Sequence, residues 1–516
     1  MKRVYKRVFF IIAILIVCVA AAGCGKSEAD YQIDETDFMT SLLQNVKFDC
    51  DLYQVKPESV ENFFTLEEGT SAVVFMGSGS YADHAGIFTS PDAESAAKTL
   101  EMVQTYVNDL RHSFEDYIPE EAAKIDGAVV EQKGKYVVLC ISSDDGAKSF
   151  IQDYFDKARD GGSNGEKDGE PSEEKDGDGE GSSDGSDVSD GSAAQKGDGE
   201  NGSSDVEEAS YPVIEKKGKV EEYGYVIAVG DTAYELYSYS EKAGEKYAEA
   251  INKAAASLKG KTKVYDVLIP LSSGITLPDR LYGEISSSSQ KKALQTLAEK
   301  MSKDVTVVNP YENLMKHRDE YIYFRTDHHW TADGAYYAYE ELCKAAGILP
   351  VSRESRESED FEGFLGSFYK DTGESKKLKE NPDTVRAYYP VSEETSLTYT
   401  TTDGKSNSWK VIWDVTDYGS SMKYSTFIAG DNPYTFIKNE ALSDGSCCVV
   451  VKESFGNALV PFLVDHYEKI YVVDYRYWEG DLTELAVEKK ADDLIFLNNL
   501  SMIRSDYLVG KLAEII

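Results

Sequence analysis

The chain has 516 residues, of which 92 are acidic and 54 are basic, so its formal net charge is −38. A chain of this length is too long for a single hydrophobic core, which predicts at least two domains. A charge this negative argues against a nucleic-acid partner, because phosphate neutralisation needs Lys and Arg in excess.

The first 23 residues are typical of a secretory leader. A basic start is followed by an apolar run from Phe9 to Ala22, which has signal-peptide length and is too short for a comfortable transmembrane helix. The run ends at Ala21-Ala22-Gly23-Cys24, which resembles a bacterial lipobox. The resemblance implies a lipid anchor on Cys24 and a protein held on the extracytoplasmic face of the cell membrane. An ordinary secretory signal is the alternative.

Residues 24–156 are expected to form a small α+β domain, with a mixed sheet and helices on one face. The expected elements are helices at about 37–46, 90–110 and 144–155 and strands at 71–76, 128–132 and 136–141. The stretches Phe75-x-Gly-Ser-Gly, Ser113-Phe-x-Asp-Tyr and Lys133-Gly-Lys-Tyr-Val resemble a domain of unknown function found in lipoproteins of Gram-positive bacteria. This resemblance implies no activity.

Residues 157–209 are expected to form a disordered acidic linker. Within 161–209 there are 16 Asp/Glu and 3 Lys, a net charge of 3 − 16 = −13, and no aromatic residue. Such a segment cannot bury enough apolar surface to offset the loss of chain entropy. As a flexible coil it is expected to hold the two domains about 40 Å apart.

The cysteines predict no metal site. None of the seven lies in a C-x-x-C pair, so neither zinc nor a redox pair is expected, and no cofactor is expected. The adjacent Cys447 and Cys448 are interpreted as small buried apolar residues. Whether Cys50 and Cys140 pair stays open.

Residues 210–516 are expected to form a larger α/β domain. Continuous apolar strands alternate with helices, which favours a parallel sheet with helices on both faces. A Thr/Tyr/Trp-rich stretch around Thr402-Asp-Gly-Lys predicts an inserted β-hairpin. The expected strands are 263–270, 305–309, 447–452, 470–474 and 493–498, and the expected helices are 241–258, 290–302 and 457–467.

Two adjacent histidines lie between a predicted strand and a helix that begins after Thr331. Asp327 and His329 are two residues apart, so the carboxylate could hold the imidazole by Nδ1–H, as in a nucleophile–His–Asp triad. A capping Asp with a packed His is the equal alternative. Ser454 follows the buried strand 447–452, where its hydroxyl could act as a nucleophile while backbone N–H groups of the next helix face an oxyanion. Helix capping is the stronger alternative for Ser454 taken alone.

Both segments together resemble a known family. Tyr323-Phe-Arg-Thr-Asp-His-His-Trp-Thr-Ala is very similar to the signature of the bacterial DHHW proteins, and Lys452-Glu-Ser-Phe-Gly-Asn and Asp474-Tyr-Arg-Tyr-Trp match its other motifs. That family looks related to the SGNH-hydrolase-like catalytic subunits of alginate O-acetyltransferases. The resemblance implies an SGNH-like fold, with Ser454 as nucleophile, His329 as general base and Asp327 as the orienting carboxylate.

Three neighbouring residues are less clearly assigned. Arg476 could bind substrate or steady an oxyanion, and an ion pair with Asp474 or Glu479 is equally expected. Asn457 is a second oxyanion or substrate candidate and could equally cap a helix. The resemblance maps no role onto His328, so a structural one is expected.

The sequence therefore favours a lipid-anchored serine O-acyltransferase or esterase that acts on a cell-envelope glycan. Transfer would need a membrane protein that supplies acetyl groups, whereas hydrolysis would not, and the sequence leaves both open. The alternatives are a non-catalytic glycan-binding or assembly lipoprotein and, less favoured, a metal-dependent phosphoesterase.

Overall fold

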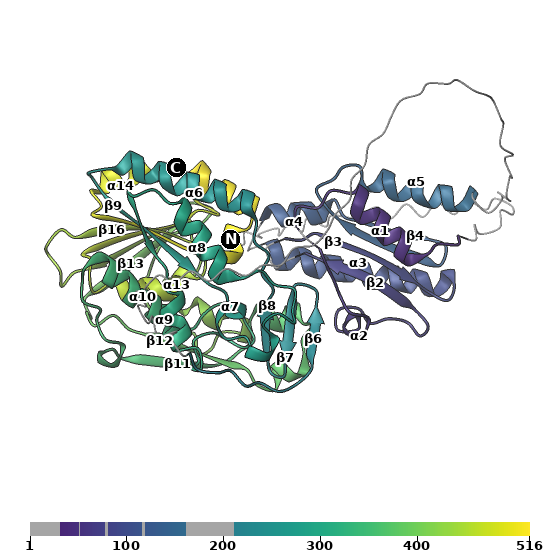
Figure 1. Ribbon diagram of the computed structural model, residues 1–516, viewed down its shortest axis with the longest axis horizontal. Coiled ribbons are helices and arrows are strands. Elements are labelled where there is room, and N and C mark those ends of the chain that lie inside the picture. Colours follow the sequence, from purple (N-terminus) through teal and green to yellow (C-terminus); the bar gives the residue numbers. More distant parts are fainter. Residues whose placement is uncertain (1–30, 51, 78–80, 116–118, 161–210) are drawn as a thin grey trace, which may run out of the picture.

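The structure is a computed structural model that describes residues 31–50, 52–77, 81–115, 119–160 and 211–516 (Figure 1). The expected leader, Cys24 and almost all of the expected linker lie outside these residues. Across the described ranges, no helix is both long and apolar enough to cross a membrane.

The N-terminal domain is a five-stranded sheet with helices on both faces. Its strand order is β1-β2-β3-β5-β4, and all neighbouring strands are antiparallel, so the predicted mixed sheet is wrong. Its strands are β1 (Tyr53–Gln54), β2 (Ser71–Met76), β3 (His84–Thr89), β4 (Val129–Lys133) and β5 (Tyr136–Ile141). Its helices are α1 (Glu35–Asn45), the short α2 (Pro57–Val60), α3 (Ala93–Glu115), α4 (Pro119–Asp126) and α5 (Ala147–Asp160).

Helices α3 and α4 share one hydrophobic cluster with the sheet, and α1 and α5 share the cluster on the other face. The predicted one-sided arrangement is wrong because both alternating sets of side chains in β5 are apolar and buried. Cys140 in β5 is a buried free thiol, so it does not pair with Cys50. Helix α5 continues to Asp160, beyond the expected start of the linker at residue 157.

The C-terminal domain is built on an eight-stranded sheet of order β10-β9-β18-β16-β17-β15-β13-β14. The first five strands of this order are mutually parallel, which confirms the predicted α/β class. These strands are β9 (Lys263–Ile269), β10 (Val305–Val308), β16 (Cys447–Lys452), β17 (Lys469–Asp474) and β18 (Asp493–Asn499).

Helices cover both faces of this sheet, as predicted. In Figure 1, α6 (Glu241–Leu258) and α14 (Leu482–Lys489) lie above the sheet, and α10 (Ala332–Ala346) and α13 (Gly456–Leu463) lie below it. Helix α8 (Gln290–Lys300) and the C-terminal α16 (Asp506–Glu514) pack against α6. The largest hydrophobic cluster of the molecule lies between these layers.

The predicted hairpin is present, and it extends the main sheet. Strands β13 (Thr395–Thr400) and β14 (Ser406–Trp409) are antiparallel, and β15 (Tyr434–Asn439) joins β13 to β17, again antiparallel. The whole sheet is therefore mixed, with an antiparallel edge on a parallel core. Two smaller sheets flank it, one of β6 (Val220–Tyr223), β7 (Val226–Val229) and β8 (Thr232–Glu235), the other of β11 (Ser358–Phe364) and β12 (Asp383–Tyr388).

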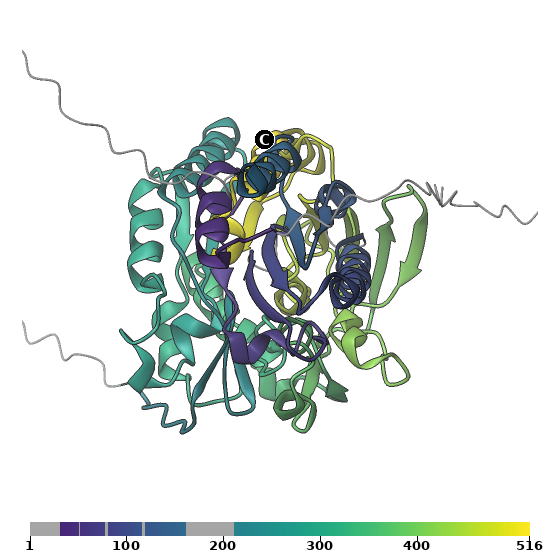
Figure 2. The ribbon, with the colours of Figure 1, turned by 90° about the vertical axis from the view of Figure 1, so that its right-hand side faces the viewer.

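The two domains are in contact, so the predicted separation by the linker is wrong. The Tyr81 hydroxyl donates a buried hydrogen bond of 2.5 Å to Ser505 Oγ, and Val55 forms an antiparallel bridge with Tyr223. Viewed end-on in Figure 2, the N-terminal domain lies directly in front of the C-terminal domain. Linker composition sets how far apart the domains can move, but it does not decide whether their surfaces bind each other.

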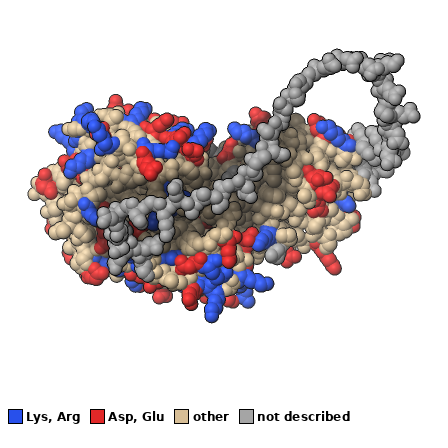
Figure 3. Space-filling view, in the orientation of Figure 1, with Lys and Arg blue, Asp and Glu red and all other residues tan. Residues whose placement is uncertain are grey.

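Surface charge is interspersed. On the face shown in Figure 3, acidic and basic side chains alternate with uncharged ones over both domains, and no single-sign patch dominates the described residues. On that face the acidic excess outside residues 161–209 is therefore spread out.

Candidate active site

The histidine motif, Asp327–Trp330, forms a tight turn directly before α10. Tyr323 and Trp330 make an isolated antiparallel bridge, and Phe324 N–H donates to the His329 carbonyl at 3.2 Å. The segment before the motif is therefore one arm of a turn and not the strand that the sequence predicts. Thr331 caps α10 through its side chain, as predicted, and so fixes where the turn ends.

Ser454 lies between the central strand β16 and helix α13, at the carboxyl edge of the parallel strands, where open α/β sheets place their ligands. Its turn is held from two sides: Trp330 Nε1–H donates to the Phe455 carbonyl at 2.9 Å, and the Tyr424 hydroxyl donates to the Ser454 carbonyl at 3.1 Å. The N-cap of α13 is Phe455, with no side-chain cap bond. Ser454 is thus not used as a helix cap.

The three residues singled out by the sequence meet in one buried chain of hydrogen bonds. Ser454 Oγ lies 2.8 Å from His329 Nε2, and His329 Nδ1 lies 2.6 Å from Asp327 Oδ1. Burial raises the pKa of the Asp327 carboxyl, but the attraction of the two neighbouring imidazoles and the hydrogen bonds outweigh it and lower that pKa well below its usual range. Asp327 is therefore an anion that can orient and stabilise the His329 ring.

The His329 ring is held by two other rings. The Tyr424 ring is stacked on it, with centroids 4.1 Å apart, and the His328 ring packs against it at a tilt of 35°, with centroids 3.9 Å apart. Burial, together with repulsion from His329, lowers the pKa of His328 to about 3, so that this imidazole is neutral. These two ring contacts leave the His329 side chain little freedom to rotate away from Ser454.

A second segment completes the support of Asp327. Helix α11 (Ser367–Asp371) begins with Ser367, whose N–H donates to Asp327 Oδ2 at 2.9 Å and whose hydroxyl lies 2.6 Å from His328 Nδ1. The preceding residue must be glycine, because a Cβ on Gly366 would lie 2.1 Å from Asp327 Oδ2. The sequence offered no signal for Gly366, Ser367 or Tyr424, which lie in irregular segments far along the chain. Trp330 could have been assigned from its place in the motif.

The backbone donors expected to face an oxyanion are engaged elsewhere. Phe455 N–H donates to Glu453 Oε2 at 3.0 Å, and the next two amides, of Gly456 and Asn457, donate to the carbonyls of Glu453 and Ser454. Glu453 also accepts from Asn499 N–H at 3.1 Å, so its carboxylate joins the turn at Ser454 to the end of β18. The prediction that these helix amides bind the oxyanion is therefore wrong.

Arg476 and Asn457 belong to a buried charge network beside Ser454. Arg476 forms ion pairs with Asp474 at 2.7 Å and with Asp431 at 2.9 Å, so of the two expected pairings the structure has the one with Asp474. Lys452 bridges the same two carboxylates, and Asn457 Nδ2–H donates to Asp431 Oδ1 at 2.8 Å. Arg476 and Asn457 therefore both bind carboxylates of the protein itself.

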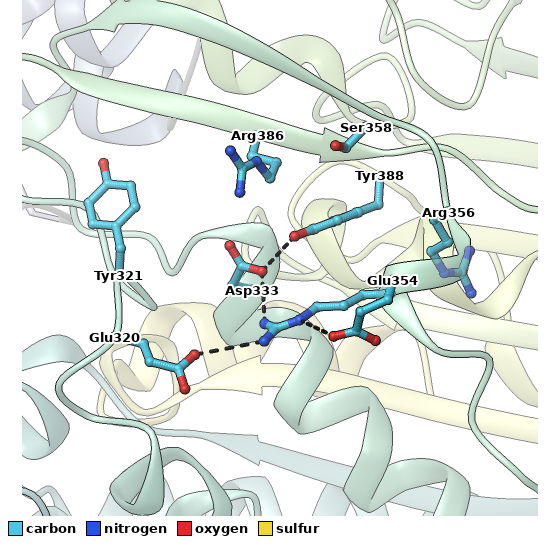
Figure 4. A pocket seen from close by; sticks show the side chains of 9 residues that line it. Glu320, Tyr321, Asp333, Glu354, Arg356, Ser358, Arg386 and Tyr388 are labelled. Carbon is cyan, nitrogen blue, oxygen red and sulfur yellow. Dashed lines mark hydrogen bonds and ion pairs between the residues drawn. The ribbon is translucent and has the colours of Figure 1, made fainter.

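A separate pocket of about 400 Å³ lies by β11 and β12 and contains none of the triad residues (Figure 4). Within it, Arg353 pairs with Asp333 at 2.8 Å, and the Tyr388 hydroxyl donates to the same carboxylate. Arg386, also in the lining, pairs with Asp360. These cations are already neutralised by acidic neighbours.

Asp327, His328 and His329 also form a group whose ligand atoms lie within 4.8 Å of one another, a spacing that could suit a metal ion. Both ring nitrogens of His329 are already hydrogen-bonded, to Asp327 and Ser454, and His328 Nδ1 is hydrogen-bonded to Ser367. The arrangement fits a proton relay from a serine better than a ligand set.

The fold and the site together define a class: an α/β protein with a buried Ser–His–Asp arrangement at the carboxyl edge of a largely parallel sheet. Residues 188–473, more than half of the chain, match the DHHW protein family, and the chain belongs to that family. Residues 49–142 match a domain of unknown function, DUF4358. Both resemblances drawn from the sequence motifs are confirmed. Among curated proteins, none matches the chain.

Solved structures share the C-terminal fold. A DHHW family protein from Eubacterium siraeum is 29% identical with a TM-score of 0.51, over 55% of this chain and 93% of that one. Bacillus cereus PatB1, solved with a sulfonyl adduct, is 19% identical with a TM-score of 0.46, over 55% and 97%. The O-acetyltransferase domain of Pseudomonas putida AlgJ is 11% identical with a TM-score of 0.31, over 55% and 96%.

Proposed function

We propose that the protein is a serine acyltransferase or esterase. The supporting observation is the continuous relay from Ser454 Oγ through His329 to Asp327, with links of 2.8 and 2.6 Å. Ser454 Oγ attacks an ester carbonyl while His329 Nε2 takes its proton, and His329 returns this proton to the leaving oxygen as the acyl-enzyme forms. A sugar hydroxyl or water then attacks the acyl-enzyme, with His329 acting as base again.

The motif also supports a proposal for the substrate class. The likeness of Asp327-His-His-Trp to the motif of alginate O-acetyltransferase subunits favours an acetyl group carried to or from a polysaccharide of the cell envelope. A lipid on Cys24 would hold the enzyme beside this polymer. Acetyl transfer in that location requires a membrane protein that exports acetyl groups, whereas de-acetylation requires only water.

Turnover of p-nitrophenyl acetate tests the reaction. We expect wild-type protein to hydrolyse the ester and to carry the acetyl group, or a sulfonyl fluoride label, on Ser454. Ser454→Ala should abolish both. His329→Ala should come close to that, because His329 Nε2 makes the short contact with Ser454 Oγ, at 2.8 Å, whereas the Glu453 carboxylate lies 3.4 Å away and already accepts from two backbone N–H groups. Asp327→Asn should cost somewhat less. If wild type and Ser454→Ala are equally inert while a glycan still binds, the non-catalytic binding function replaces this proposal.

The anchor is tested separately. Cys24→Ser should move the protein from the membrane fraction to the soluble fraction of the producing cell, since the thiol is the site of lipid attachment. Retention of the variant in membranes would contradict the lipoprotein proposal, but it would not affect the proposal for the serine reaction.

A further inference from the structure

The proposed reaction needs hydrogen-bond donors for the oxyanion, and the three backbone amides that follow Ser454 are committed to other acceptors. The N–H groups of Phe455, Gly456 and Asn457 donate to protein oxygens, as does the Asn457 side chain. A carbonyl oxygen that becomes an oxyanion without a donor forfeits what is commonly the largest electrostatic contribution to acyl transfer. A donor other than these groups is therefore expected near Ser454.

His328 carries a buried polar atom that satisfies this need. Its Nε2 is buried and has no hydrogen-bond partner among the described residues. Buried polar atoms without partners are rare in folded proteins and call for an explanation in each case. Here the atom belongs to the residue whose ring packs against that of the general base, with ring centroids 3.9 Å apart.

The hydrogen bonds of the ring decide which nitrogen carries the proton. The Ser367 hydroxyl oxygen accepts from His328 N–H at 3.3 Å and lies 2.6 Å from His328 Nδ1. Within the described part of the chain, the Ser367 hydroxyl has no acceptor other than Nδ1, so its hydrogen points there. Nδ1 is then the acceptor of a neutral ring, and Nε2 carries the hydrogen as an unused donor.

The positions of the two Nδ1 atoms indicate where the His328 Nε2–H group lies. Both Nδ1 atoms are on the Asp327 side, at 2.6 Å for His329 and 3.9 Å for His328. In an imidazole, Cε1 separates Nε2 from Nδ1, and because the Nδ1 atoms of these neighbouring rings face the same carboxylate, we infer that both Nε2 atoms lie on the side away from Asp327. That is the side of Ser454, whose Oγ is 2.8 Å from His329 Nε2.

We propose that His328 is a catalytic residue that donates its Nε2–H to the acyl oxygen, an inference that rests on the proposed serine reaction. As the Ser454 Oγ–C bond forms, the carbonyl π electrons move to oxygen, which accepts the His328 hydrogen bond without taking the proton. The serine proton goes to His329. When the carbonyl re-forms, the leaving oxygen departs with that proton and His328 is unchanged.

Three substitutions distinguish a hydrogen-bond donor role of His328 from a packing role. His328→Ala should lower kcat for p-nitrophenyl acetate by about 10²–10³-fold, the usual cost of one oxyanion donor, with KM changed less than about threefold. His328→Gln places an amide N–H near the position of Nε2 and should keep kcat within about tenfold of wild type. His328→Asn places its amide near Nδ1 only, so it should be as slow as His328→Ala.

Melting temperature and Ser454 labelling serve as controls, since all three variants should remain folded and keep the nucleophile. Equal kcat for wild type and His328→Ala, with Ser454 labelled in both, overturns the inference and leaves the proposed function standing. Equal loss in the Gln and Asn variants also overturns it, because a packing role does not distinguish the position of the amide. A wild-type protein that neither turns over ester nor labels Ser454 overturns both proposals.

Discussion

Gly366 sets how closely α11 approaches the Asp327 carboxylate. Its backbone has φ −92° and ψ −153°, which any residue adopts, so the requirement for glycine is purely one of space. A methyl group there would lie 2.1–2.5 Å from three atoms of Asp327. Because displacement of a catalytic group by about 1 Å can cost 10²-fold, Gly366→Ala should lower kcat by at least tenfold. Gly419→Ala is the matched control, since nothing lies within 4 Å of its added Cβ, and it should keep wild-type kcat.

Asp266 gives the protein a pH-dependent stability. It is fully buried in β9 and accepts a 2.5 Å hydrogen bond from Tyr247, and burial raises its pKa to about 7. Between pH 4 and 7 the folded state holds a proton that the unfolded state releases, so stability falls as pH rises through this window and levels off above it. The fall should be on the order of 4 kcal/mol.

Asp266→Asn removes this titration. The urea midpoint of wild type should drop from pH 4 to pH 7, and this drop should be much smaller in the variant, which should be the more stable protein at pH 8. Asp417→Asn, at an exposed position, should follow the wild-type curve. A variant that keeps the full wild-type drop would show that other groups cause it.

Part of the candidate site could be predicted from the sequence. That Asp327, His329 and Ser454 lie together was predictable because the motif and the strand–turn pattern are local in sequence. The stacking of Tyr424, the space at Gly366 and the commitment of the Phe455 amide to Glu453 depend on contacts between distant segments, which no local pattern encodes.

At the scale of elements, β12 holds the segment that leads into the histidine motif. The fully buried Asp383 carboxylate at the start of β12 accepts from the N–H groups of Arg325 and Thr326 and from the Thr326 hydroxyl, at 2.7–3.1 Å. Removing it leaves these donors buried and unpaired, at about 1–3 kcal/mol each. Asp383→Ala should therefore lower the free energy of unfolding by more than about 3 kcal/mol, measured by urea denaturation.

Asp360→Ala is the control for this prediction. Asp360 lies in the partner strand β11 and pairs with Arg386 on the surface, with both side chains more than 40% exposed. Exposed ion pairs contribute about 0–1 kcal/mol, so this variant should stay within 1 kcal/mol of wild type. Equal losses in the two variants would contradict the anchoring role of Asp383.

The elements of the parallel core were predictable because their apolar runs are continuous and their helices are capped. Strands β9 and β16 and helix α6 lie within one residue of the expected ranges. The antiparallel extension through β15 was not predicted, since Tyr434–Asn439 alternates buried and half-buried residues and carries no turn signal linking it to β17. Sheet order between strands far apart in sequence depends on tertiary packing.

At the scale of the molecule, the N-terminal domain is bound to the edge of the sheet that carries the triad. Ser505, the partner of Tyr81, follows the carboxyl end of β18, and a Cβ on Gly373, just after α11, would lie 2.2 Å from the Asn62 carbonyl. The Phe63 ring packs against hydrophobic clusters of both domains, and its centroid lies 6.3 Å from that of the Tyr223 ring. The contact is thus partly apolar and close to the elements that support Asp327.

This contact predicts that the domains stay associated without a covalent connection. If a protease site is placed within residues 161–209 and cut, the two fragments should elute together in gel filtration, because contacts such as Tyr81–Ser505 and Phe63–Tyr223 do not involve that segment. Adding Phe63→Asp buries a charge against the Tyr223 ring and should release the fragments. Leu349→Asp, at a side chain that is 87% exposed, should not. Separate elution of the unsubstituted cut fragments would mean that the domains meet only when the linker holds them at high local concentration.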